Sequence, residues 1–314
     1  MIFSYHSGFA DDINSMIEFK KALGRKAKGY EWGLLSFDRF CQIEFSNACE
    51  LTKEIVLSWC NDAKENGASN YRMHIMREFG KYLISIEKKA FVLPAKLIPP
   101  YKVGIPYIFT DDELRRFFRA TDEIPHDTRS PLLEYTAPTI FRLQFGCGLR
   151  PPEVRLLKRR DFNFSDGTVY ISESKRRKDR RLALNEGLVK LCRRYDAIAQ
   201  MHYPNRTYFF HSPNGGAYKS GWLTAQFHKS WEKAGLGNER GPCTPYDFRH
   251  NFATRTLMRW VEEDRDLEVL IPYLSAYMGH ESFNSTYYYV HLLPERLANM
   301  DFTKANGIIP EVLS

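Results

Sequence analysis

A proline-rich stretch divides this sequence into two parts. Between Val92 and Pro106 the chain carries four prolines and one glycine, at positions 94, 99, 100, 104 and 106. Proline cannot donate the backbone hydrogen bond of a helix or a central strand, and its ring clashes with the preceding helical turn. At 314 residues the chain is also longer than most single domains. The sequence therefore predicts folded parts at 1–91 and 107–291, an extended linker at 92–106 and a C-terminal segment at 292–314.

The first part has the periodicity of α-helices. Apolar residues recur at helical spacing in four segments, 11–22, 30–41, 51–63 and 70–89. The fourth segment sets an apolar stripe against a basic face made of Arg72, Arg77, Lys81 and Lys88. An ordinary amphipathic helix is the simpler interpretation of any one segment. Together, a basic helical bundle ahead of a larger domain is typical of a module that grips DNA.

The second part mixes helices with a small sheet. Thr110 and Glu113 form a capping-box pattern, which predicts a helix at 111–120. Further helices are expected at 132–145, 186–200 and 223–234, and strands at 168–171, 181–184 and 208–211. The Asp-Gly pair at 166–167 is typical of a hairpin turn. We expect a mainly α protein with a small antiparallel β-sheet: a helical bundle followed by a mixed α/β domain.

The charge balance favours an anionic partner. The net charge is +7 and the pI is near 9.0. Nucleic acid is the first candidate and an anionic membrane surface the second. The loop SKRRKDRR between two predicted strands concentrates six positive charges, on Lys175, Arg176, Arg177, Lys178, Arg180 and Arg181. A solvated basic loop is the simpler interpretation, but such charges repel one another unless an anion lies among them, so we expect contact with the DNA backbone.

Several other classes lack their signatures. No apolar run is long enough to span a membrane. The six cysteines show no paired spacing, which predicts free thiols in a reducing cytoplasm rather than disulfides or a zinc site. The sequence has no phosphate-cradling glycine loop, no H-E-x-x-H and no G-x-S-x-G. A nuclease that relies on two metal ions should show clustered carboxylates, and this chain offers arginines instead. We expect no metal and no cofactor.

Residues 243–291 carry the strongest chemical signal. They open with CTPYDFRHNFAT, in which Thr244 is a candidate helix N-cap and Asp247 can close a capping box. A helix N-terminus with a guanidinium beside it is a natural phosphate site, so Arg249 is a candidate anion ligand. The stretch closes with MGHESFNSTYYYVH, in which His280 follows a glycine and precedes three consecutive tyrosines.

A second arginine of interest lies about a hundred residues upstream. In GCGLRPPEV, Arg150 stands between a glycine-broken helix end and a short helix that begins with prolines. Glu153, three residues later, can pair with Arg150 and fix its orientation. For this segment alone, a surface Arg–Glu pair worth under ~1 kcal/mol is an equally good interpretation.

Taken in order, the motifs GCGLRPPEV, SESKRRKDRRLAL, YDFRHNFAT and MGHESFNSTYYYVH resemble those of the tyrosine recombinase (phage integrase) family of site-specific DNA recombinases. The resemblance covers roughly residues 30–300. It implies that a helical core-binding domain at 1–91 and a catalytic domain at 107–291 clamp DNA as a C shape. It also implies cleavage and rejoining of DNA through a 3′-phosphotyrosyl intermediate, without metal or ATP.

The resemblance assigns the cationic residues one by one. Arg150 resembles the first catalytic arginine, with Glu153 as its supporting acid, and Arg249 resembles the second arginine. Lys175 resembles the hairpin lysine that acts as general acid for the leaving 5′-oxygen. Lys178 is the alternative, because a flexible hairpin can present either lysine.

The histidines and tyrosines are assigned in the same way. His280 resembles the histidine that contacts the phosphate, and Tyr289, nine residues later, resembles the nucleophile, with Tyr288 as the fallback. The sequence departs from the family at Tyr246, where a histidine is usual. A phenol can donate a hydrogen bond to a phosphate but is a poor general base near neutral pH. His250, about 100° further around the helix than the second arginine, is expected to support the site from beside it.

The expected partner is double-stranded DNA that contains a recombination site. The resemblance implies a homotetramer on that DNA, docked through residues 292–314, with room for accessory proteins and a nucleoid-associated place in the cytoplasm. Two alternatives stay open: an enzyme with the same chemistry, such as a type IB topoisomerase or telomere resolvase, and an accessory DNA-binding protein whose catalysis has decayed. The further residues expected to contact DNA are Arg176, Arg177, Lys178, Arg180, Arg72, Lys81 and Lys102.

Overall fold

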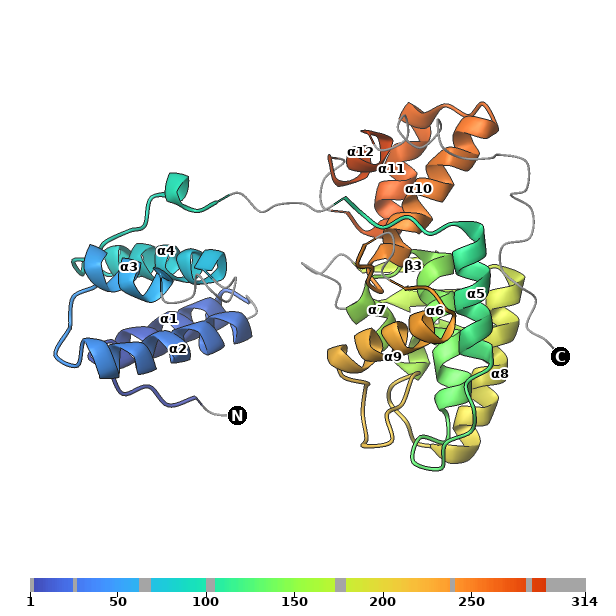
Figure 1. Cartoon of the computed structure of the whole chain (residues 1–314), viewed down its shortest axis with the longest axis horizontal. Coiled ribbons are helices and arrows are strands. Elements are labelled where there is room, and N and C mark those ends of the chain that lie inside the picture. Colours follow the sequence, from blue (N-terminus) through green and yellow to red (C-terminus); the bar gives the residue numbers. More distant parts are fainter. Residues whose placement is uncertain are drawn as a thin grey trace. The chain divides into compact units, whose positions relative to one another are not determined.

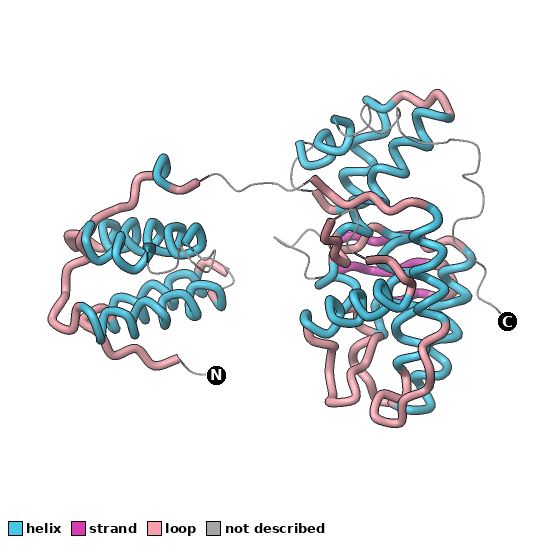
Figure 2. The backbone as a smooth tube through the Cα atoms, viewed as in Figure 1, coloured by secondary structure: helices cyan, strands magenta, loops and turns pink. Residues whose placement is uncertain are grey.

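The chain divides into two compact units, Met1–Gly104 and Ile105–Ser314 (Figure 1). The computed structural model describes residues 3–24, 27–61, 69–99, 105–172, 179–237, 241–280 and 284–291. Helices dominate both units, and the described strands form one small antiparallel sheet in the second unit (Figure 2). This confirms the expected mainly α fold with a small antiparallel β-sheet.

The described part of the first unit is a bundle of four α-helices in the four expected segments. They are α1 (Ala10–Ala22), α2 (Lys28–Glu44), α3 (Lys53–Asn61) and α4 (Ser69–Ser85), followed by a short 3-10 helix, η2 (Ala95–Leu97). The bundle is centred on the buried rings of Phe9, Phe37, Trp59 and Phe79. Gly33 lets α2 approach α4, because a Cβ at this position would lie 2.0 Å from Cδ1 of Ile75.

The predicted linker at 92–106 begins against the first unit. Leu93 is fully buried in the core of the bundle, and η2 follows it. Residues 100–104, including Lys102, lie outside the described residues. The end of the bundle is therefore closed by residues that the proline pattern assigns to the linker.

The second unit is built around α6 (Leu133–Cys147), which is buried over most of its length. The helices α5 (Asp111–Asp122), α7 (Pro151–Leu156), α8 (Glu186–His202) and α10 (Asp247–Glu262) pack against it. α9 (Ser220–Lys233) lies on α5 and α7, whereas α11 (Leu267–Met278) and α12 (Asn284–His291) gather with α10 at one end of the unit (Figure 1). The capping box of Thr110 and Glu113 forms as predicted and starts α5.

The sheet has the order β1-β2-β3 and is antiparallel throughout. Its strands are β1 (Phe162–Asn163), which follows the 3-10 helix η3 (Arg159–Asp161), β2 (Thr168–Ile171) and β3 (Arg180–Ala183). Val169, Ile171 and Leu182 are buried in the core, and Tyr170 pairs with Arg181 on the outer face. The hairpin strands predicted at 168–171 and 181–184 are thus present, the second one residue earlier than expected.

Two local predictions are wrong. Residues 208–211 are not a strand, because they make only isolated bridges, with Lys158 and with Ala217. Both Phe209 and Phe210 are fully buried, which breaks the in-and-out alternation of a strand at a sheet surface. The helix expected to start after Thr244 begins at residue 247 instead.

The start of α10 is fixed by a carboxylate in place of the expected threonine cap. The carboxylate of Asp247 accepts hydrogen bonds from the backbone N–H and the hydroxyl of Thr244, at 2.7 and 2.9 Å. The N-cap residue is Tyr246, whose side chain makes no capping hydrogen bond. A turn therefore precedes the helix and brings Tyr246 to its edge.

Phe248 is the aromatic centre of the second unit. Its ring is fully buried and lies 5.3–6.1 Å from six other phenylalanine rings, those of Phe109, Phe117, Phe118, Phe141, Phe145 and Phe227. Such contacts add to the free energy of burial. Because Phe248 immediately precedes Arg249, this packing also fixes the position of the arginine.

We predict that Phe248→Ala lowers the free energy of unfolding of the second unit by about 3–5 kcal/mol, because it leaves a large cavity among rigid rings. Denaturant unfolding followed by circular dichroism measures the change. Tyr273→Ala is the control, because that side chain is 69% exposed on α11. A loss for Phe248→Ala no larger than that of the control would contradict the central role of this ring.

Candidate active site

Residues from four separate elements meet at one end of the second unit. Arg150 is the N-cap of α7, and Glu153 lies in that helix. Arg249 lies in the first turn of α10, His280 follows the end of α11, and Tyr289 lies in α12. These five residues are close in space although they are spread between positions 150 and 289 of the sequence.

Arg249 is fully buried at the meeting point of two helix ends. Its Nη1 donates to the carbonyl oxygen of Gly148 at 2.8 Å, and its Nη2 donates to that of Met278 at 2.7 Å. Its Nε has no hydrogen-bond partner among the residues that the structure describes. Burial, together with the nearby charge of Arg150, lowers the pKa of Arg249 to about 10. The guanidinium still carries its charge at neutral pH.

Glu153 is a carboxylate shared by two arginines. Arg150 donates to it from Nη1 at 2.6 Å and from its backbone N–H at 2.9 Å. Arg180, the first residue of β3, donates from Nη1 and Nη2 at 3.1 and 2.9 Å. Burial alone would raise the pKa of Glu153, but the hydrogen bonds and charges of Arg180 and Arg150 hold it at about 2. The carboxylate is therefore ionised throughout the physiological range.

Arg180 differs from its expected place on a DNA-contacting surface. Its guanidinium is turned inward, with 9% of the side chain exposed. Besides Glu153 it binds the backbone carbonyl of Tyr277, to which Nε donates at 2.7 Å. Arg150 reaches the same end of α11, because its Nη2 donates to the carbonyl of Gly279 at 2.8 Å. The two arginines thus fix α7 and β3 to the end of α11.

Gly279 ends α11 in the left-handed conformation, with φ at +65°. This conformation favours glycine, and a Cβ at this position would also lie 2.9 Å from Nη1 of Arg180. The turn directs His280 into the site, where its Nδ1 lies 2.7 Å from the hydroxyl of Thr286. Burial and then Arg249, Arg150 and Arg180 lower the pKa of His280 to about 3, so its imidazole is neutral at pH 7.

The side chain of Tyr289 is almost completely buried in the centre of this group. Its ring lies nearly parallel to that of His280, with centroids 6.2 Å apart, and only 3% of the residue is exposed. Its hydroxyl is 3.0 Å from Nδ1 of His250. Burial raises the pKa of Tyr289, and the charge of Arg249 acts in the opposite direction. Tyr288 lies beside it, in an edge contact at 5.6 Å.

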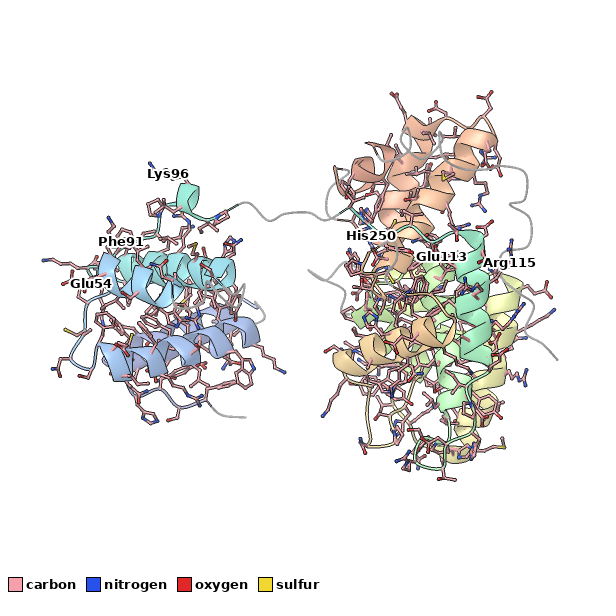
Figure 3. All side chains as sticks on the ribbon, viewed as in Figure 1. Glu54, Phe91, Lys96, Glu113, Arg115 and His250 are labelled. Atoms are coloured by element: carbon pink, nitrogen blue, oxygen red, sulfur yellow. The ribbon has the colours of Figure 1, made fainter. Side chains whose placement is uncertain are left out.

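Tyr246, the N-cap of α10, and His250 lie four residues apart at the start of this helix. The Tyr246 residue is 41% exposed, and its ring centroid lies 5.1 Å from that of His250. The His250 ring in turn lies 5.6 Å from that of Tyr289. His250, which Figure 3 labels, therefore contacts both tyrosines.

The expected DNA contacts are only partly described. Lys175, Arg176, Arg177 and Lys178 lie outside the described residues, as does Lys102. In the first unit, Arg72 stacks on the ring of Trp59 at 4.7 Å and donates to its carbonyl, and Lys81 pairs with Glu78 at 3.4 Å on the surface.

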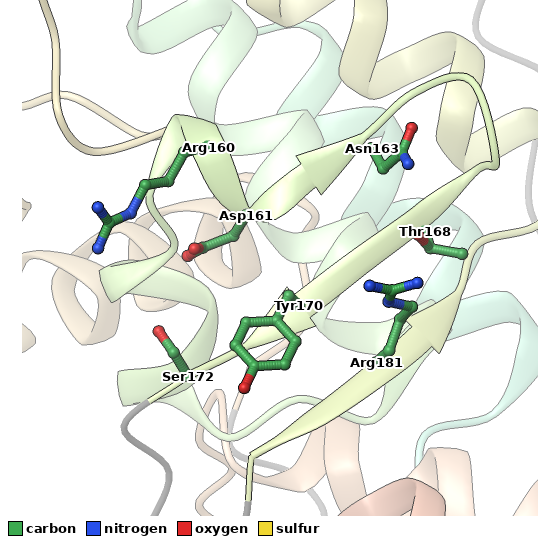
Figure 4. Close-up of a pocket in the computed structure, with 7 residues that line it drawn as sticks. All are labelled: Arg160, Asp161, Asn163, Thr168, Tyr170, Ser172 and Arg181. Atoms are coloured by element: carbon green, nitrogen blue, oxygen red, sulfur yellow. The ribbon is translucent and has the colours of Figure 1, made fainter.

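A polar hollow of about 410 Å³ lies on the outer face of the sheet (Figure 4). It is lined by Arg160, Asp161, Asn163, Thr168, Tyr170, Ser172 and Arg181. The hydroxyl of Tyr170 donates to the carboxylate of Asp179, which immediately precedes β3. Two arginines thus border the part of the sheet that adjoins the basic loop.

Two side-chain contacts in the site could not be predicted from the spacing of the sequence motifs. The pairing of Arg180 with Glu153 depends on the register in which Ile171 faces Arg180, which a basic run of six charges does not reveal. The contact of His250 with Tyr289 depends on how α12 packs on α10. The sequence signal that pointed to His250 is its four-residue spacing from Tyr246, which puts the two side chains on one face of the helix.

The chain belongs to the phage integrase family, the tyrosine recombinases: the family model described as "Phage integrase family" matches residues 108–296. Along most of its length it is similar to y4rB of Sinorhizobium fredii, an integrase/recombinase by name, with 29% identity over 298 residues, 92% of this chain and 94% of that one. The tyrosine recombinase XerC of Proteus mirabilis is 26% identical over 232 residues, 73% of this chain and 69% of XerC.

Solved structures share the fold. A lambda integrase fragment, crystallised as a dimer bound to a COC′ core site, gives a TM-score of 0.62 at 15% identity, covering 88% of this chain and 96% of that chain. The XerH site-specific recombinase in a post-cleavage complex with difH gives a TM-score of 0.61 at 18% identity, covering 86% of this chain and 77% of that chain. Within the described residues no helix is long and apolar enough to cross a membrane.

We predict that Glu153→Gln destabilises the protein at pH 7 on the order of 3 kcal/mol, because it leaves two guanidiniums without their buried counter-charge. The folded-state pKa of about 2 lies below the ordinary value of 4.5. The contribution of the ionised Glu153 carboxylate to stability is therefore full above pH 4.5 and is lost as pH falls toward 2. Urea unfolding of the wild type and the variant between pH 7 and pH 3 measures the difference in their free energies of unfolding. This difference should become smaller as the pH falls.

Glu186→Gln is the matched control, because Glu186 forms an exposed pair with Lys190 on α8. Its effect on unfolding should be near zero at every pH. A gap for Glu153→Gln that stays constant down to pH 3 would contradict the ionised role of Glu153.

Proposed function

We propose that this protein is a site-specific DNA recombinase that cuts and rejoins DNA strands through Tyr289. One observation carries the proposal: the side chains of Arg150, Arg249 and His280 meet around a tyrosine ring within a single buried site. Membership of the phage integrase family supports it. So does the likeness in fold to XerH and lambda integrase, whose structures were solved with DNA.

The two arginines suit a phosphodiester under attack. A nucleophile that adds to phosphorus builds negative charge on the non-bridging oxygens, and guanidiniums can hold that charge through paired hydrogen bonds. Arg249 keeps a buried Nε without a described partner, and Arg150 is held in place by Glu153. In the proposed reaction these groups replace a metal ion as the source of positive charge.

Tyr289 is the proposed nucleophile. Its phenolic oxygen forms a bond to phosphorus while the bond from phosphorus to the 5′-oxygen breaks, and Lys175 gives that oxygen its proton. The product is a 3′-phosphotyrosyl link and a free 5′-hydroxyl. Because one phosphodiester is exchanged for another, rejoining needs no ATP. His280 donates a hydrogen bond to the phosphate from its neutral ring.

The described site is closed around its own nucleophile. Arg249 has no exposed surface, and Tyr289 is 3% exposed. A phosphate can reach both only if the packing around them opens, so we propose that DNA binding opens the site without separating Tyr289 from His250.

DNA contact is proposed along the basic hairpin and the hollow beside it. Arg160 and Arg181 border that hollow. The basic loop residues 175–178, Lys102 and the α4 residues Arg72 and Lys81 are proposed as further contacts, whereas we assign Arg180 to holding Glu153. The complete assembly is proposed as a tetramer on DNA, in which the two units of each protomer clamp the duplex and residues 292–314 dock on a neighbour.

Because Tyr246 stands where the family usually has a histidine, a second candidate function is a DNA-binding accessory protein whose catalysis has decayed. A third, a type IB topoisomerase-like enzyme, shares the chemistry but not the site specificity. Adduct formation excludes the second candidate. Relaxation of a supercoiled plasmid that lacks a specific site identifies the third.

We predict that Tyr289→Phe abolishes the covalent protein–DNA adduct and leaves DNA binding within about twofold of wild type, because only the hydroxyl is removed. The probes are nicked duplexes made from inverted repeats that flank the gene. Denaturing gels detect the adduct, and mobility shift measures binding. Tyr273→Phe, on the exposed side of α11, is the control. An adduct that persists in Tyr289→Phe would move the nucleophile to Tyr288 or Tyr287.

We predict that Arg249→Lys lowers the single-turnover cleavage rate by about a hundredfold or more, since an ammonium cannot present the paired donors of a guanidinium. Rapid-quench measurement on the same nicked duplexes tests it. Arg193→Lys, at an exposed position on α8, should cleave at the wild-type rate. A loss below tenfold would show that Arg249 does not stabilise the transition state.

A further inference from the structure

We propose that His250 is a catalytic residue, whose Nδ1 takes the proton of the Tyr289 hydroxyl as the tyrosine attacks. This inference rests on the proposed function, in which Tyr289 is the nucleophile. It supplies the general base that the sequence lacks at Tyr246.

The geometry places the two groups in contact. The Tyr289 hydroxyl lies 3.0 Å from Nδ1 of His250, within the reach needed for direct proton transfer. When the ring proton is on Nε2, Nδ1 has a lone pair that accepts the hydrogen bond. The contact links α10 to α12, so the base and the nucleophile come from separate elements that meet at the site.

Helix geometry explains how a histidine at this position can replace one at 246. Residues four apart lie on the same face of a helix, one turn above the other. Tyr246 and His250 follow this spacing, and their ring centroids are 5.1 Å apart. Tyr246 is at the exposed edge of the site, whereas His250 lies one turn further in, against the nucleophile.

The protonation state of His250 suits a base. Burial lowers its pKa below 6.5, and the charge of Arg249 acts in the same direction, whereas Asp247 acts against both. The imidazole is therefore neutral at pH 7 and can accept a proton. The other nearby histidine, His280, has its pKa lowered to about 3 and has Nδ1 bonded to Thr286, so it is a much weaker base.

The proton balance closes over the full cycle. In cleavage, the phenolic oxygen of Tyr289 bonds to phosphorus and its proton passes to Nδ1 of His250. The electron pair of the broken bond goes to the 5′-oxygen, which takes a proton from Lys175. In rejoining, the 5′-hydroxyl attacks the phosphotyrosine and its proton returns to Lys175, while the imidazolium returns its proton to the departing tyrosine oxygen.

The test uses the full chain on the nicked duplexes described above. His250→Asn keeps an amide near the position of Nδ1 but removes the basic nitrogen, and His250→Ala removes the side chain. We expect cleavage to slow by about 10²–10⁴-fold in both variants, with DNA binding unchanged. Imidazole added at millimolar concentration should restore part of the rate to His250→Ala and none to Tyr289→Phe.

A pH profile of the wild type needs no variant. The cleavage rate should fall as pH drops below 6.5 through the pKa of His250, because the protonated ring cannot accept the phenolic proton. The charged and titratable groups that face this ring are Tyr246, Asp247 and Arg249 from α10 and Tyr289 from α12. In His250→Asn this fall should disappear.

The outcomes separate the two proposals. If the wild type forms no adduct, the proposed function fails. If the wild type forms the adduct and His250→Asn cleaves within threefold of its rate, only the role of His250 fails. The role of His250 is also overturned if His250→Ala cleaves slowly, imidazole does not restore its rate, and the pH profile of the variant is the same as that of the wild type. A purely structural role gives that pattern.

Discussion

The ion pair that Glu153 makes with two arginines holds the candidate active site together. Arg150 must sit next to Arg249, although two guanidiniums repel each other, and the pKa of Arg249 is lowered partly for this reason. The buried carboxylate of Glu153 offsets that repulsion and binds Arg180 as well. Most of the remaining N–H donors of these arginines bind backbone carbonyls, those of Gly148, Met278, Tyr277 and Gly279. The negative ends of α6 and α11 are thereby turned toward the cations, where they are favourable.

Much of this arrangement could be predicted from the sequence. Helix caps, prolines and apolar periodicity located the helices, since these signals are local. Arg150, Arg249, His280 and Tyr289 were selected by motif order, and the structure brings all four together, although their chemical roles stay proposals. The assignments on residues 173–178 fall outside the described residues.

The remainder could not be predicted because it depends on tertiary contacts. Arg180 belongs to a run of like charges, and only the strand register turns it toward Glu153 rather than toward solvent. The segment at 208–211 has the composition of a strand, but its two end residues bridge to separate partners, Lys158 and Ala217, so it forms no ladder. His250 stands next to a key arginine in sequence, yet its contact with Tyr289 comes from the docking of α12.

The position of Arg180 has a consequence for how the site responds to DNA. It is the first residue of β3, two positions after the last residue of the basic run at 175–178. Through Arg180, β3 binds the same carboxylate of Glu153 that orients Arg150. The proposed DNA contact of the basic run and the orientation of Arg150 are therefore coupled through Arg180 and Glu153.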